Sequence, residues 1–214
     1  AQLSVVVDPD VLYSHYSYTT SQSRMMFDHF TSLWDCIKDR HPNPDNVLEI
    51  GSNDGTFLKF LQENGVPYVL GIDPAENLAE KADANGVRTL RGLFTDSDMA
   101  KVASSAMPTV DVVMARHVFC HVDDWHGFVK SLDVVCQKET LVVIEVPYVA
   151  DLLKQVQFDT IYHEHLSYMN VRAMVALLDG TPFKLHAVQH FPIHAGAIVL
   201  YLRRRDYNGL ADDS

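Results

Sequence analysis

The stretch Val47-Leu48-Glu49-Ile50-Gly51-Ser52-Asn53-Asp54-Gly55 decides the fold. Its first four residues predict a short buried strand, and its two glycines predict a tight turn. Residues 56–61 continue as an amphipathic helix with apolar side chains at helical spacing. A strand, a glycine-bearing turn and a helix in this order form the front edge of a nucleotide-binding α/β unit.

An acidic residue follows this unit where a ribose-binding carboxylate is expected. The next apolar run ends in Asp73, within the usual interval of about 20 residues from the turn. The turn itself carries Asp54, and Glu49 lies just before it. Two carboxylates repel a pyrophosphate but attract an ammonium and a sulfonium group. S-adenosylmethionine has both groups and a ribose diol, so the turn favours this cofactor over a dinucleotide.

Alternating apolar and amphipathic segments predict the rest of the fold. Strands are expected at residues 47–50, 68–72, 87–90, 111–115, 140–146, 183–190 and 196–203. Helices are expected at residues 24–40, 55–64, 76–84, 96–106, 122–135 and 169–178. The last two strands have no helix between them and should form an antiparallel pair at one edge. The predicted fold class is α/β: a Rossmann-like, mostly parallel sheet of seven strands with an antiparallel edge hairpin, as in class I S-adenosylmethionine methyltransferases.

The composition narrows the class of protein. With 214 residues, 47% hydrophobic and 21% charged, the chain can bury the core of a globular domain. A net charge of −11 argues against nucleic acid as the main partner, because the phosphate backbone requires a basic surface. Cys36, Cys120 and Cys136 share no C-x-x-C spacing, so reduced thiols are expected. No apolar run has the length of a membrane span, and no membrane partner is predicted; a soluble, cytoplasmic protein is expected.

Three parts are expected along the chain. Residues 1–45 form an aromatic segment and a helix that cover the site, residues 46–207 form the cofactor-binding core, and residues 208–214 form a polar tail. The first residue is not Met, and the tail shows no clear element. The sequence is therefore expected to be part of a longer protein with further domains at both ends.

Titratable and aromatic side chains gather where ligands bind in open parallel sheets, beyond the carboxyl ends of the strands. One group, residues 115–121, follows the fourth strand; a second, residues 158–165, follows the fifth; a third surrounds Tyr16. The second contains the densest run, Tyr162-His163-Glu164-His165. Alternation along an extended loop would place His163 and His165 on one face and Glu164 on the other.

Three uses of this run are open. Histidine takes a proton near neutral pH, so the run can provide a catalytic base with a tyrosine partner. It can instead contribute to a metal site, or it can be a structural loop whose imidazoles bond the backbone. Because the chain offers no matching ligand pair at helical spacing, no metal is predicted.

Other histidines and tyrosines receive weaker assignments. His117 is expected to be structural, whereas His121 can lie either in the cleft or outside it. Tyr16 is the tyrosine expected in the cleft. Packing or surface positions are expected for Tyr13, Tyr18, His186 and His190, and the position of His194 is left open.

Four segments carry a resemblance to a known family. They are Glu49 to Leu58; Gly71-Ile72-Asp73-Pro74-Ala75 with Asn77 and Ala79; Phe158 to His165; and Val11-Leu12-Tyr13 with Tyr16-Ser17-Tyr18. In these segments the chain resembles the nucleotide-sugar C-methyltransferases of deoxysugar biosynthesis. Members of that family usually carry an N-terminal zinc-binding module and a C-terminal nucleotide-holding domain, and neither is recognisable in these 214 residues.

The resemblance implies methyl transfer from S-adenosylmethionine to a carbon next to a ketone of a nucleotide-linked deoxysugar, with S-adenosylhomocysteine as product. Such a carbon is not nucleophilic until a proton leaves, so a base and an enolate stabiliser are required. By similarity His165 is the base. Residues that orient the keto-sugar or bind the enolate oxygen are implied at Tyr162, Glu164, His121 and Tyr16. Cofactor contacts are implied at Glu49, Gly51, Asn53, Gly55, Asp73, Leu93 and Phe94.

Two other functions remain open from the residues. The histidines can deprotonate a hydroxyl or amine of another small molecule, which gives an O- or N-methyltransferase. The chain can also be a non-catalytic S-adenosylmethionine-binding domain of a larger protein.

Overall fold

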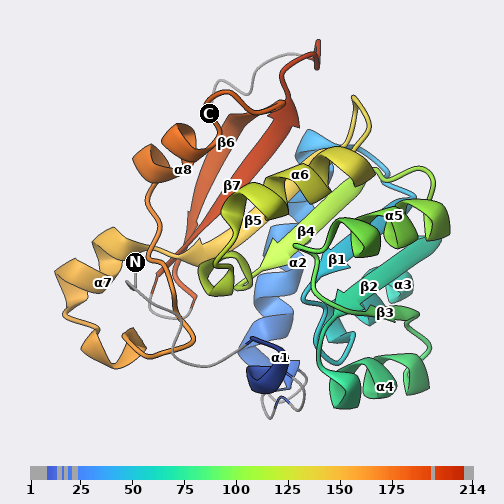
Figure 1. Cartoon of the computed structure of the whole chain (residues 1–214), viewed down its shortest axis with the longest axis horizontal. Helices are drawn as coiled ribbons and strands as arrows, with labels where there is room; N and C mark the ends of the chain where they lie inside the picture. Colours follow the sequence, from blue (N-terminus) through green and yellow to red (C-terminus); the bar gives the residue numbers. More distant parts are fainter. Residues whose placement is uncertain (1–8, 14–15, 17–18, 21–23, 194–195, 210–214) are drawn as a thin grey trace.

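The computed structural model describes residues 9–13, 16, 19–20, 24–193 and 196–209. Its strands are β1 (Asn46–Ile50), β2 (Tyr68–Asp73), β3 (Thr89–Arg91), β4 (Val112–Arg116), β5 (Leu141–Pro147), β6 (Phe183–Phe191) and β7 (Ala197–Arg204). They form one sheet in the order β3-β2-β1-β4-β5-β7-β6 (Figure 1). β1 to β5 pair in parallel, whereas β7 is antiparallel to both β5 and β6. The predicted sheet and its antiparallel edge hairpin are confirmed.

The helices are α1 (Pro9–Leu12), α2 (Arg24–Arg40), α3 (Thr56–Glu63), α4 (Glu76–Ala84), α5 (Ser97–Ala106), α6 (Trp125–Val135), α7 (Val149–Gln155) and α8 (Val171–Leu177). Two single turns of 3₁₀ helix, η2 (Phe119–His121) and η3 (Phe158–Thr160), follow β4 and α7. Side chains of α5, α6 and α8 pack on one face of the sheet, and those of α2 and α3 pack on the other. Within the described part of the chain, no helix combines the length and apolarity needed to cross a membrane.

Period-two alternation along the central strands assigns each side chain to one of these faces. Val142, Ile144 and Val146 join the core under α5 and α6. Leu141 and Val143 join the core under α2, so Glu145 also points to that side. By the same alternation Glu49 and Arg116 lie on the α2 side, next to each other. Three charged side chains are therefore buried at the carboxyl ends of β1, β4 and β5.

Most predicted elements are confirmed within a few residues, with two exceptions. The helix expected at 122–135 begins at Trp125, because the Asp124 side chain accepts the Gly127 N–H at 2.8 Å and caps the helix there. Helix α7 was not predicted; it is short and ends at Gln155, where Val156 caps it in the left-handed region with a φ of 54°. Part of the predicted tail, residues 210–214, lies outside the described residues.

Candidate active site

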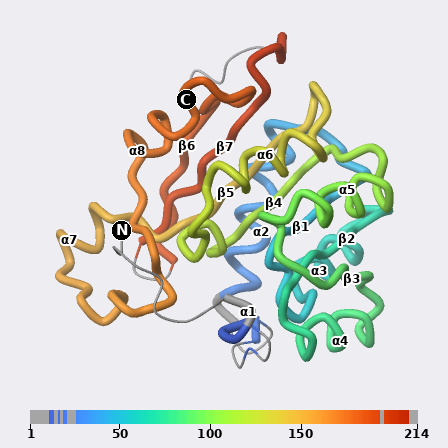
Figure 2. Tube along the Cα trace, in the orientation of Figure 1, coloured from blue at the N-terminus to red at the C-terminus, as the bar shows by residue number. Residues whose placement is uncertain are grey.

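A cavity of about 860 Å³ lies at the carboxyl ends of the parallel strands. Its floor includes the residues that end β1, β2, β4 and β5: Ile50, Asp73, Arg116 and Pro147. Figure 2 shows α1, which belongs to the N-terminal segment, near this end of the sheet. Tyr13, Tyr16 and Thr20 from that segment line the cavity. The described part of the N-terminal segment therefore forms one wall.

The turn after β1 approaches the cavity with bare backbone. Gly51 has a φ of 66°, and a Cβ built on it would overlap the Val118 side chain. Gly55 has a φ of 74°, and its Cβ would lie 2.9 Å from that of Ala82 on α4. Both positions therefore require glycine, but for different reasons. Gly51 lines the cavity, whereas Gly55 lets the turn pack on α4 and does not line it.

Asp73 is at once a cavity residue and a support of the turn. Its Oδ2 accepts the Asn53 N–H at 2.8 Å, and its Oδ1 accepts the Ala75 N–H at 2.9 Å. Burial raises the pKa of Asp73, although these two backbone hydrogen bonds oppose the shift. Asn53 also lines the cavity, and its Oδ1 accepts the Thr20 N–H at 3.1 Å, which joins the N-terminal segment to the turn.

The other two carboxylates of the motif do not face the cavity, which corrects their expected position. Glu49 is completely buried, and its Oε1 accepts Arg116 Nε at 2.8 Å and Nη2 at 2.7 Å. Burial raises the pKa of Glu49 to about 7, with Arg116 opposing the shift. Asp54 is 3% exposed and accepts the Thr56 hydroxyl at 2.6 Å. Neither carboxylate can therefore contact a ligand in the cavity. The prediction from the sequence, which placed both carboxylates against the ligand, is corrected on this point.

His165 is a buried imidazole on the cavity wall with a defined tautomer. Its Nδ1 lies 2.9 Å from the Thr160 carbonyl oxygen, which can only accept, so Nδ1 carries the proton. The Tyr162 hydroxyl lies 2.9 Å from Nε2 and donates to it. Burial lowers the pKa of His165, so the neutral ring with a basic Nε2 is favoured near neutral pH.

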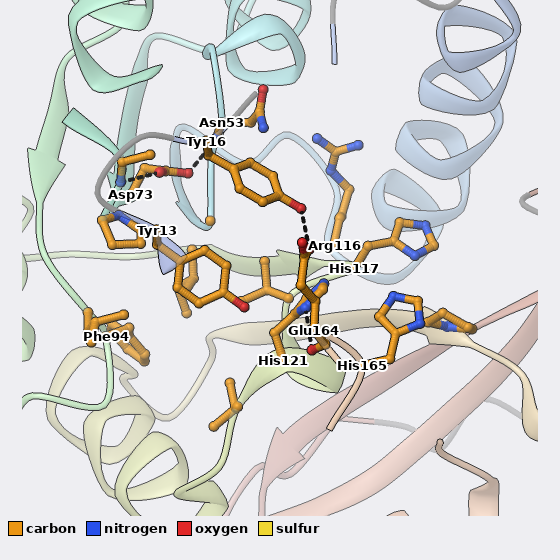
Figure 3. Close-up of a pocket in the computed structure, with 18 of the residues that line it drawn as sticks. Tyr13, Tyr16, Asn53, Asp73, Phe94, Arg116, His117, His121, Glu164 and His165 are labelled. Atoms are coloured by element: carbon orange, nitrogen blue, oxygen red, sulfur yellow. Dashed lines mark hydrogen bonds between the residues drawn. The ribbon is translucent and has the colours of Figure 1, made fainter. Parts of the chain in front are cut away.

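Glu164 connects two other expected site residues, Tyr16 and His121 (Figure 3). The Tyr16 hydroxyl donates to Glu164 Oε2 at 2.9 Å, from the opposite wall of the cavity. The Glu164 carbonyl oxygen lies 2.8 Å from His121 Nδ1. Burial lowers the pKa of His121 to about 4, and the neighbouring His165 acts in the same direction. The Asn77 side chain holds the backbone of Tyr16: its Oδ1 accepts the Tyr16 N–H, and its Nδ2 donates to the Tyr16 carbonyl oxygen.

All five expected catalytic residues line one cavity: Tyr16, His121, Tyr162, Glu164 and His165. Leu93 and Phe94 line it as well. The expected pairing of His163 with His165 is wrong, because residues 162–164 form a turn that the His165 N–H closes onto the Tyr162 carbonyl. Glu164 and His165 face the cavity instead, and the His163 side chain is 52% exposed.

Sequence reasoning placed three cavity residues incorrectly or missed them. Tyr13 lines the cavity, with its ring 5.8 Å from that of Tyr16, although it was expected only to pack. Arg116 and His117 also line it. The alternation Val112-Met114-Arg116 could have placed Arg116 beside Glu49. His190 pairs with Asp151 at the sheet edge, as expected for a surface histidine, whereas Tyr18 and His194 lie outside the described residues.

Cys120, His121 and His165 have side-chain nitrogen or sulfur atoms within 4.8 Å of one another. Among the described residues, this is the grouping that comes nearest to a metal site. Both ring nitrogens of His165 and Nδ1 of His121 are already hydrogen bonded, and burial raises the pKa of the Cys120 thiol to about 12. Since a metal needs a thiolate and available ring nitrogens, the arrangement favours hydrogen bonding over metal binding.

Comparison with known proteins decides the family. A family model described as a methyltransferase domain matches residues 21–188. The chain belongs to this family. The methyltransferase is 34% identical over 198 residues to C-methyltransferase NovU of Streptomyces niveus, a match that covers 92% of this chain and 47% of NovU. It therefore spans about half the length of that relative.

Solved structures support the fold. The methyltransferase resembles the PH0226 protein of Pyrococcus horikoshii with a TM-score of 0.70 at 15% identity, covering 88% of this chain and 95% of that one. It resembles a SAM-dependent methyltransferase from Archaeoglobus fulgidus with a TM-score of 0.64 at 17% identity, covering 84% and 94%. The chain is thus a methyltransferase domain with the class I fold, and S-adenosylmethionine is the cofactor of this family.

The cavity fits this cofactor. Gly51 and Asn53 bring the turn to the cavity, and Asp73 brings carboxylate oxygens there, where they can accept from ribose hydroxyls. Leu93 and Phe94 give an apolar wall for a base. Of the residues expected to contact the cofactor, only Glu49 and Gly55 lie behind this surface.

Proposed function

We propose that this methyltransferase transfers a methyl group to a carbon next to a ketone in a nucleotide-linked deoxysugar. The observation that carries the proposal is the buried, neutral His165, whose basic Nε2 is held by the Tyr162 hydroxyl on the cavity wall. Similarity to a protein named a C-methyltransferase over 92% of the chain supports carbon as the acceptor. Because NovU is about twice as long, activity of this chain by itself is part of the proposal.

The residues of the turn and of β2 would hold the cofactor. Asp73 would accept from the ribose hydroxyls, Leu93 and Phe94 would enclose the adenine, and the backbone at Gly51 and Asn53 would meet the methionine end. When bound, S-adenosylmethionine supplies a methyl group whose bond to sulfur breaks with the electron pair remaining on sulfur. Glu49 would act indirectly by holding Arg116, and Gly55 would act by shaping the turn.

The imidazole and its neighbours would generate the nucleophile. His165 Nε2 takes the proton from the carbon, and the electron pair of that bond moves toward the ketone oxygen to give an enolate. Tyr162 has to release Nε2 in this step, and its hydroxyl can then donate to the enolate oxygen. Glu164, held by Tyr16, and His121, held by the Glu164 carbonyl, would orient the sugar.

The same side chains support the proposed substrate class. A keto-sugar presents hydroxyl and carbonyl groups to the tyrosines, Glu164 and the imidazoles that line the cavity. The net charge of −11 disfavours nucleic acid as a partner, and three unpaired thiols are compatible with a cytoplasmic location.

The test uses methyl-labelled S-adenosylmethionine and a dTDP-linked keto-deoxysugar. We expect NMR of the product to show the labelled methyl group bonded to the carbon next to the ketone. A methyl group on oxygen or nitrogen would support an O- or N-methyltransferase instead. Cofactor binding without transfer to the sugar would support a binding domain and contradict the proposal.

A further inference from the structure

A buried carboxylate lies directly beneath the cavity and plays no part in the steps above. Glu145, near the end of β5, is completely buried. Its Oε1 lies 2.7 Å from His29 Nε2 on α2 and 3.7 Å from His117 Nε2 at the end of β4. Burial acts to raise the pKa of Glu145, but the charge and hydrogen bonds of His117 and His29 outweigh it and hold this pKa well below its usual range.

A buried carboxylate is stable only when a positive charge compensates it. Two imidazoles are within reach, and they differ in exposure: the His29 side chain is 5% exposed, whereas the His117 side chain is 23% exposed and lines the cavity. Desolvation penalises a charged ring less at the more exposed position. His117 is therefore the imidazole beside Glu145 that also reaches the cavity, whereas His29 lies beneath the cavity against the same carboxylate.

The cavity has few other sources of positive charge among the described residues that line it. Arg116 donates twice to Glu49, and its guanidinium lies 4.9 Å and 4.2 Å from the ring centres of Phe30 and Phe57. The positive charge of Arg116 is thus compensated by the Glu49 carboxylate beneath the turn. His121 and His165 are driven toward their neutral forms by burial, and His117 adds to the effect on both.

We propose that His117 is a further catalytic residue, an imidazolium anchored by Glu145 that stabilises the enolate oxygen of the substrate. This inference rests on the proposed function, because it concerns the same reaction. His117 lines the cavity on the α2 side of the site, where Figure 3 shows it near Arg116 and His165. Its backbone is held in the left-handed region, with a φ of 53°, and its N–H donates to the Glu145 carbonyl at 2.8 Å.

The titratable and charged groups around His117 determine how a charge on its ring would act. Glu145 from β5 and His29 from α2 lie beneath it, Arg116 with Glu49 lies on the cofactor side, and His121 and His165 lie on the substrate side. A cation at His117 favours neutral His165, which is the form that removes a proton. The same cation attracts the negative charge that this removal creates on the ketone oxygen. One charged ring thus assists both halves of the step.

The kinetic test measures exchange of the substrate proton with deuterium oxide, using a dTDP-linked keto-deoxysugar and S-adenosylhomocysteine. His117→Gln is expected to slow the exchange roughly a hundredfold to a thousandfold with little change in KM, which is the usual effect of losing one oxyanion donor. The matched control His126→Gln changes an exposed histidine on α6 and should leave the rate unchanged. His29→Gln keeps a donor to Glu145 and should reduce the rate only a few fold.

A second readout does not depend on turnover. In protein with isotope-labelled histidine, NMR should show His117 as an imidazolium at neutral pH, assigned by its loss in His117→Gln. Glu145→Gln should shift that ring to the neutral form; if this variant does not fold, the ionisation state in the wild type decides. A neutral His117 in the wild type overturns the inference, and so does exchange in His117→Gln within threefold of the wild type.

The two failures are distinguishable. If the wild type exchanges the proton and His117→Gln does so equally fast, the proposed function stands and the role of His117 is wrong. If the wild type shows no exchange with the keto-sugar, the proposed function fails, and the role of His117 on an enolate fails with it, even where NMR shows the charged ring.

Discussion

Gly51→Ala tests how closely the turn after β1 is fitted to its surroundings. An alanine at this φ of 66° costs about 1–2 kcal/mol in backbone strain. Its Cβ would also overlap the Val118 side chain, and overpacking of this kind adds about 1–3 kcal/mol. The free energy of unfolding should therefore fall by roughly 2–5 kcal/mol. Since the turn lines the cavity, binding of S-adenosylmethionine should weaken at least tenfold.

A second glycine provides the matched control. Gly65 has a φ of 92°, and a Cβ built there meets no atom within 4 Å. Gly65→Ala should therefore show the backbone strain alone, about 1–2 kcal/mol, with cofactor affinity unchanged. Replacing the overlapping side chain in the double variant Gly51→Ala, Val118→Ala should recover part of the stability and affinity that Gly51→Ala loses.

Urea denaturation gives the free energies of unfolding, and titration calorimetry gives the affinities for S-adenosylmethionine. The reasoning is refuted if Gly51→Ala and Gly65→Ala have equal stability and equal affinity. It is also refuted if Val118→Ala gives no recovery, because the overlap with Val118 would then not be the cause.

Three further predictions concern the cavity wall. Asp73→Ala should weaken S-adenosylmethionine binding more than tenfold and lower the free energy of unfolding by about 2 kcal/mol, because the Asn53 and Ala75 N–H groups lose their acceptor; calorimetry and denaturation measure both. Tyr16→Phe removes a hydrogen bond to a carboxylate, an interaction of about 1.5–3 kcal/mol, so kcat/KM should fall between tenfold and a hundredfold in steady-state assays while cofactor affinity changes little. Because burial lowers the pKa of His165, the acid limb of kcat/KM against pH should lie below the ordinary value of 6.5, and a limb above 6.5 would contradict a buried neutral base.

The sequence was sufficient for the sheet and for the position of the site. The strand–turn–helix order from Val47 and the lone final hairpin predict the strand pairing, since βαβ connections and hairpins leave few alternatives. The carboxyl-end rule then predicts that Asp73, His121 and His165 meet at one edge, and all three line the same cavity.

What the sequence could not supply was the direction of particular side chains. Glu49 was assigned to the ligand because it precedes the turn, yet period-two alternation with Val47 turns it toward α2 and Arg116. His163 was placed beside His165 on the assumption of an extended loop, whereas a turn at 162–164 reverses that order. His117 offered no signal of its own, because its partners Glu145 and His29 lie far from it in the sequence.

The central claim is that His165 removes a proton from carbon, and deuterium exchange into the keto-sugar tests it most directly. With S-adenosylhomocysteine bound, the wild type should incorporate deuterium next to the ketone. His165→Asn and His165→Ala should bind S-adenosylmethionine by calorimetry but incorporate no deuterium. Incorporation in both variants at the wild-type rate would remove His165 from the role of base and contradict the account.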